Sequence, residues 1–160
     1  MKVLALLLAL ILSILACLPD RNSLPKGPLE FTTIFEGQHS LADTSSTYLI
    51  NNSEHWAKIW QFANGKIEPM PVLPVIDFNK YAIIAVFMGQ KSSAGHRVEI
   101  SEIVQYPKLS VSDGYLSVKA INYKRTGGMM LPVLTSPCHI VKIMKSQPKL
   151  SVTYIEVTEQ

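Results

Sequence analysis

Four histidines, six methionines and two cysteines are the side chains of this 160-residue sequence that best suit soft metal ions. Imidazole and sulfur together favour copper(I) or zinc. His96 and the pair Cys138-His139 stand where strands are expected to begin, so they can meet at one end of a sheet. No Cys or His pair has the short spacing of a structural zinc site, so a protein without a metal or other cofactor is the simpler interpretation. The alternative metal site would use His96, Met129, Met130, Cys138 and His139.

The spacing of the candidate side chains gives little support for nucleophilic or acid–base catalysis. Cys138 and His139 are adjacent, and neighbours on a strand point to opposite faces. Glu99 and Glu102 differ by an odd number, so a regular strand would separate their carboxylates as well. No local signature of a nucleophile elbow is present. We therefore expect a protein that is not an enzyme, with Cys138 buried among apolar neighbours.

The N-terminus resembles an export signal. Lys2 precedes an apolar run that ends in Ile14-Leu15-Ala16-Cys17 and is shorter than the about 20 residues of a membrane span. A branched residue, a small residue and then cysteine resembles the lipobox of bacterial lipoproteins, in which the cysteine sulfur carries a diacylglycerol. Residues 1–16 would then be the signal peptide and Cys17 the lipid anchor in the cell envelope. Because Leu18 is not the aspartate typical of inner-membrane retention, this resemblance implies the outer membrane where a cell has one.

The rest of the chain divides into a linker and one domain. Residues 17–30 contain three prolines and no apolar periodicity, as a linker should. Residues 31–160 are expected to form a single mainly β domain, an antiparallel β-sandwich with one helix in its N-terminal half covering an end or an edge. The expected strands are 31–39, 48–50, 81–88, 96–105 with a slip after Ile100, 109–111, 115–123, 138–144 and 150–157.

A helix is expected over 51–65, and a fully buried strand over 81–88. Trp56, Ile59, Trp60 and Ala63 fall on one helical face, which favours packing against the core over partner binding. Asn51 and Glu54 have the spacing of a capping box, with Ser53 as an alternative cap. The run Tyr81–Met88 is apolar throughout, as a central strand covered on both faces would be.

Composition excludes several classes of protein. The 15 Lys and Arg against 12 Asp and Glu give a net charge of +3, and the basic residues are not clustered. Nucleic acid is therefore not expected as a partner, because its binding needs grouped basic contacts. Two cysteines exclude a disulfide-rich miniprotein.

Two loops rich in glycine and polar residues flank buried strands, at Gly89–Gly95 and Lys124–Pro137. Loops held by a rigid sheet often carry recognition. The residues expected to contact a partner are Gly89, Gln90, Lys91, Ser92, Ser93, Gly95, His96, Gly127, Gly128 and Met129.

Around these loops the sequence resembles a known family. The segments Gly89–Ile100 (GQKSSAGHRVEI) and Thr135–Ile143 (TSPCHIVKI) resemble the C-terminal domain of PrcB-type protease complex subunits, and the likeness extends over most of 31–157. Where the family usually has a Gly-Gly-aromatic triplet and a Pro-aromatic pair, this chain has Ala94-Gly95-His96 and Pro137-Cys138. The resemblance implies an exported, often lipidated protein that accompanies and stabilises a surface protease.

We therefore expect a non-enzymatic, lipid-anchored accessory module that binds and stabilises a partner protein. An exported protease is the partner that the resemblance implies. A protease inhibitor whose exposed loop Met129–Pro137 enters a protease cleft is one alternative. The copper or zinc protein described above is the other.

Overall fold

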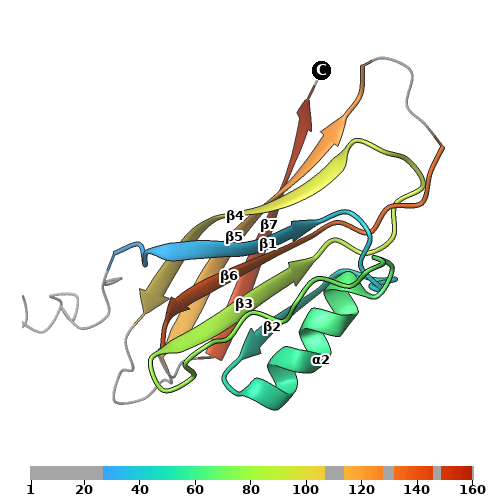
Figure 1. Cartoon of the computed structure of the whole chain (residues 1–160). Helices are drawn as coiled ribbons and strands as arrows, with labels where there is room; N and C mark the ends of the chain where they lie inside the picture. The colour runs from blue at the N-terminus through green and yellow to red at the C-terminus, as the bar shows by residue number, and fades with distance from the viewer. Residues whose placement is uncertain (1–26, 107–113, 128–131, 146–148, 160) are drawn as a thin grey trace, which may run out of the picture.

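The computed structural model describes residues 27–106, 114–127, 132–145 and 149–159, the last of these by its backbone only. In these ranges the chain forms seven strands and one helix, stacked as helix, four-stranded sheet and three-stranded sheet (Figure 1). The prediction of a mainly β sandwich with one helix is confirmed. The elements are β1 (Phe31–Gly37), β2 (Ser46–Ile50), α2 (Ser53–Asn64), β3 (Tyr81–Phe87), β4 (His96–Tyr106), β5 (Tyr115–Arg125), β6 (Cys138–Met144) and β7 (Lys149–Glu159).

The four-stranded sheet has the order β1-β6-β3-β2 and is antiparallel throughout. β3 lies inside this sheet, as its unbroken apolar run predicted, and Ala82–Phe87 are fully buried. Because side chains alternate along a strand, Ile84 faces the second sheet while Ile83 faces the helix. The same alternation along β6 sends His139 and Cys138 to opposite faces.

The three-stranded sheet has the order β4-β5-β7. β4 and β5 are antiparallel, and the slip expected after Ile100 is a bulge between Ile100 and Glu102. The strand expected at 109–111 lies outside the described residues. β5 and β7 are parallel, which differs from the expected antiparallel arrangement. The reason is that β6 lies between them in sequence but belongs to the other sheet, so the chain crosses over and returns in the direction of β5.

The helix α2 covers a face of the four-stranded sheet, not an end or an edge. Its predicted apolar face is buried, and the side chains of Trp56, Ile59, Trp60 and Ala63 pack on that sheet. The cap is Asn52, whose side chain accepts the His55 N–H at 2.8 Å, so neither Asn51 nor Ser53 has that role.

The proline-rich segment 67–75 runs along the helix and is bound to it by the tryptophans. The indole N–H of Trp56 donates to the Pro74 carbonyl and that of Trp60 to the Pro71 carbonyl, both at 2.9 Å. These bonds satisfy the polar ends of two buried rings.

The chain before β1 is attached to the second sheet. Pro28 pairs with Val104, and the Leu29 N–H donates to the Ile103 carbonyl at 2.7 Å. The end of the segment predicted as a linker therefore covers part of the β4 edge, and Leu29 packs against the core between the sheets.

Candidate functional site

The two loops singled out from the sequence lie side by side at one end of the sandwich. Lys91 and Thr135 exchange two backbone hydrogen bonds, at 2.8 and 2.9 Å. The Thr135 hydroxyl also donates to the Ser93 carbonyl at 3.1 Å, and the Arg125 N–H donates to the Gly95 carbonyl at 2.9 Å. These contacts join the loops to each other and to the start of β4 and the end of β5.

Two glycines in the first loop adopt conformations that other residues rarely take. Gly89 has a φ of +75° and Gly95 a φ of +91°. At Gly89 a Cβ would also lie 2.7 Å from the Thr44 carbonyl carbon and 2.8 Å from the Ser45 nitrogen. Gly89 is therefore needed for the shape of the loop, and this explains its presence without a direct contact to a partner.

The segment 135–137 is a fixed support for the loops. The Ser136 hydroxyl donates to the Ala42 carbonyl at 2.7 Å, and the Ser40 hydroxyl donates to the Ser136 carbonyl at 2.9 Å. The Met88 N–H donates to the Pro137 carbonyl at 2.9 Å. Both serines are buried and their hydroxyls are engaged, so we assign them a structural role.

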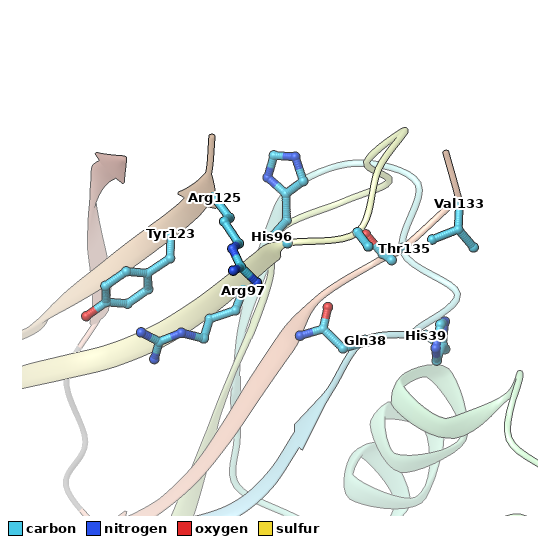
Figure 2. Close-up of a pocket in the computed structure, with 10 residues that line it drawn as sticks. Gln38, His39, His96, Arg97, Tyr123, Arg125, Val133 and Thr135 are labelled. Carbon is cyan, nitrogen blue, oxygen red and sulfur yellow. The ribbon is translucent and has the colours of Figure 1, made fainter. Parts of the chain in front are cut away.

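Beside this support lies a cleft of about 410 Å³. Figure 2 shows its walls, which come from the residues just after β1, the loop before β4, the facing ends of β4 and β5, and the loop before β6. Among the described residues that line it, none is acidic and four carry imidazole or guanidinium groups. The lining residues are Gln38, His39, Ala94, Gly95, His96, Arg97, Tyr123, Arg125, Val133 and Thr135.

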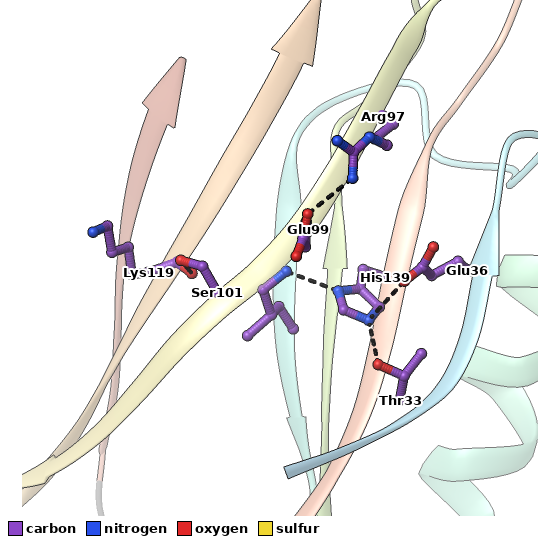
Figure 3. A network of polar contacts seen from close by, with 8 residues as sticks. Thr33, Glu36, Arg97, Glu99, Ser101, Lys119 and His139 are labelled. Atoms are coloured by element: carbon purple, nitrogen blue, oxygen red, sulfur yellow. Dashed lines mark hydrogen bonds and ion pairs between the residues drawn. The ribbon is translucent and has the colours of Figure 1, made fainter. Parts of the chain in front are cut away.

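Arg97 is held in place by two neighbours on the outer face of the sheet. Its guanidinium bonds to the Glu99 carboxylate at 2.9 Å (Figure 3) and lies 3.7 Å from the centre of the Tyr123 ring. Arg97 and Tyr123 are opposite each other in the β4–β5 register, so their contact is a cross-strand pair.

Only part of the predicted contact set borders this cleft. Gly95 and His96 line it, whereas Gly89, Gln90, Lys91, Ser92 and Ser93 build the loop beside it. Gly127 is exposed, and Gly128 and Met129 lie outside the described residues.

Sequence reasoning missed Gln38, His39, Arg97 and Tyr123 as cleft residues, and it included Arg125 only as part of the loop Lys124–Pro137. The outward-facing alternate positions of β5 contain Tyr123 and Arg125, and this pattern could have identified them. Tyr123 and Arg125 share a cleft with Arg97 because of the strand register, and the register cannot be read from the sequence.

His139 is buried between the sheets and joins three strands (Figure 3). Its Nδ1 accepts the Ile100 N–H of β4 at 2.8 Å, so the neutral ring carries its proton on Nε2. Nε2 lies 2.9 Å from the Thr33 hydroxyl of β1 and 3.5 Å from the Glu36 carboxylate. Burial lowers the pKa of His139, while the charges of Glu36 and Glu99 act in the opposite direction.

Cys138 faces the helix side of the same strand and is free and buried. Burial raises the pKa of its thiol to about 12, against a smaller lowering by the Gly37 backbone. Cys138 therefore stays a protonated thiol at neutral pH.

The metal alternative gains no geometric support in the described part of the chain. Cys138 and His139 point away from each other, so one ion cannot bind both side chains. No group of three or more His, Cys, Asp or Glu side chains in the described ranges could hold an ion. Met129 and Met130 of the alternative set lie outside the described residues.

The two carboxylates expected on opposite faces of β4 are on the same face. Val98, Ile100 and Ile103 all point into the core, because the bulge at Ser101 adds one residue and shifts the alternation. Glu99 and Glu102 consequently both face outward, and the prediction from their odd spacing is wrong. Glu99 is engaged by Arg97, which makes it part of the support of the cleft.

The N-terminal features lie outside the described residues, including the signal peptide of residues 1–16 and Cys17. Within the described ranges, no helix is both long and apolar enough to cross a bilayer.

Comparison with known proteins gives one match. The family model described as PrcB C-terminal matches residues 82–144, from β3 to β6, and this range includes both loops. It covers part of the wider span, 31–157, over which the sequence resembled that family. No curated protein and no solved structure matches the chain.

Proposed function

Because residues 82–144 belong to the PrcB C-terminal domain family, we propose that this chain is an exported, non-enzymatic accessory module that binds a partner protein. It would be anchored to the cell envelope by a lipid on Cys17. An exported protease is the partner that we propose to test first.

One observation carries this proposal: the two loops within the family match frame a cleft on a rigid support. The loops are fixed to each other through Lys91 and Thr135, and to the sandwich through buried serines. Such a preorganised surface loses little conformational entropy on binding. The thiol of Cys138 is buried and protonated, and the hydroxyls of Ser40 and Ser136 are engaged in hydrogen bonds, which fits binding better than catalysis.

The position of the N-terminal attachment also supports an anchored binding module. The chain joins β4 at Ile103 and Val104, whereas the cleft is at His96, the other end of β4. Seven residue steps along β4 separate His96 from Ile103, about 23 Å at the usual rise of about 3.3 Å per residue. In Figure 1 the described N-terminal end lies at one end of the sandwich, and the loop 89–95 and residues 132–137 lie at the other. A lipid on Cys17 would thus leave the cleft facing away from the bilayer.

Site-specific cross-linking in the native membrane tests the proposal. A photo-reactive amino acid at exposed Ser92 should capture one dominant exported protein, identified by mass spectrometry. The matched control carries the same group at exposed Asn79, before β3 at the other end of the sheet. The same proteins from both positions, or none from Ser92, would contradict the proposal.

The activity of a captured protease then separates two roles. A protease that is lost from cells lacking this chain identifies a stabilising subunit. A protease that becomes more active in those cells identifies an inhibitor.

A further inference from the structure

We propose that the cleft at the loop end binds an acidic peptide segment with apolar side chains, presented by the partner protein. Arg125 and Arg97 would take its carboxylates and Val133 its apolar side chains. This inference rests on the proposed function and names the chemistry of the partner.

The charge of the cleft points to an acidic ligand. Arg97, Arg125, His39 and His96 line it, and none of its described lining residues is acidic. Arg97 is bonded to Glu99, and the exposed Arg125 at the end of β5 is the second guanidinium of the cleft. Guanidinium groups bind carboxylates through two parallel hydrogen bonds, which gives such a contact direction as well as strength.

The apolar part of the cleft points to a peptide and away from a small inorganic anion. Val133 lines the cleft and is 42% exposed, and its neighbour Leu134 is 63% exposed. Arginine and tyrosine are enriched at the centres of protein interfaces, and the buried core of an interface is more apolar than its rim. An inorganic anion would leave these aliphatic groups uncovered.

Gln38 offers a contact suited to a peptide backbone. Its amide carries both a donor and an acceptor, as a peptide unit does. In the view of Figure 2 it lies between the arginine side chains and Val133. A bound segment could therefore pass over Gln38 with acidic side chains toward Arg125 and apolar ones toward Val133.

Binding of labelled peptides to the purified full-length chain in detergent tests this. The probes are fluorescein-labelled Glu-Val-Glu-Val-Glu and its lysine counterpart Lys-Val-Lys-Val-Lys, followed by anisotropy. We expect the acidic peptide to bind and the basic one not to bind, with an affinity that falls as salt rises. Arg125→Gln should weaken the acidic peptide at least fivefold. The matched control Lys80→Gln removes the same charge at the other end of the sheet and should change affinity less than twofold.

A charge-reversal variant distinguishes the loss of the binding site from the loss of the fold. Arg125→Glu should lose the acidic peptide and gain the basic one, with an unchanged circular dichroism spectrum. Equal binding of both peptides by the unmodified chain, or no effect of Arg125→Gln, would overturn the inference. So would displacement of the acidic peptide by millimolar inorganic phosphate, which would identify a site for small anions. If peptide binding fails while cross-links from Ser92 persist, the inference falls and the proposed function stands.

Discussion

At the scale of single residues, His139 determines how the two sheets meet. β4 is an edge strand, and its Ile100 N–H is satisfied by the His139 ring in place of another strand. Protonation of Nδ1 would set a donor against that N–H, so the folded protein favours the neutral ring. Burial acts in the same direction and lowers the pKa of His139.

Stability should therefore fall when the pH drops below the ordinary histidine pKa of 6.5. Below that value the unfolded chain gains a proton that the folded chain resists, and the loss continues until the lowered folded pKa is reached. Urea unfolding between pH 8 and 5 measures this loss, and His139→Gln should be less stable at pH 8 but less sensitive to acid. An equal loss between pH 8 and 5 in both proteins would assign the acid sensitivity to other groups.

Gly89 gives a second prediction at this scale. Gly89→Ala should lower the free energy of unfolding by about 1–3 kcal/mol, because its backbone has positive φ and a Cβ would meet the backbone of Thr44. Gly127→Ala, at an exposed position, is the control and should stay within about 0.5 kcal/mol. Equal urea midpoints for the two variants would show that the loop can rearrange.

At the scale of elements, the helix and the proline-rich segment act as one unit. Trp56 and Trp60 are buried against the four-stranded sheet, and their indole N–H groups bind the segment on the other side. The prolines restrict the segment to extended backbone, so few bonds suffice to hold it.

Replacing Trp60 by Phe should loosen this segment. The change removes the donor to the Pro71 carbonyl and part of a buried ring, at a cost of about 1–3 kcal/mol. Proteolytic cleavage within segment 67–75 should quicken, while hydrogen exchange in β3 stays slow. Tyr81→Phe serves as the control, because the hydrogen bond between Trp60 and Pro71 does not involve Tyr81. Unchanged cleavage would mean that the segment is held by other contacts.

The same scale shows what the sequence could predict. The spacing of Trp56 and Trp60 and the unbroken run of β3 are local signals, and both predictions were confirmed. The slip after Ile100 is also visible in the sequence, whereas the regular alternation that would separate Glu99 from Glu102 ignores the residue added by the bulge. The parallel pairing of β5 with β7 depends on β6 joining the other sheet, a choice between distant partners that no local pattern encodes. The cleft was missed for the same reason, since Arg97 and Tyr123 meet only through register.

At the scale of the whole molecule, the sandwich separates the N-terminal attachment from the end that carries the cleft. Pro28 and Leu29 are fixed at one end of β4, and the cleft opens at the other. If the proposed lipid on Cys17 anchors the chain, the attachment of residues 28 and 29 would favour an orientation in which the cleft lies at the end of the domain remote from the bilayer.

This arrangement can be measured on full-length lipidated chain in vesicles that contain a lipid-bound quencher. A fluorophore at exposed Asn79, near the attached end, should be quenched more than one at exposed Ser92, beside the cleft. The reason is that the two positions lie at opposite ends of β3, and quenching by a lipid-bound group declines steeply with distance. A Cys17→Ser variant removes the lipid and should abolish quenching at both positions. Stronger quenching at Ser92 than at Asn79 would mean that the cleft faces the bilayer, and a lipid surface would then replace the acidic segment as the ligand to test.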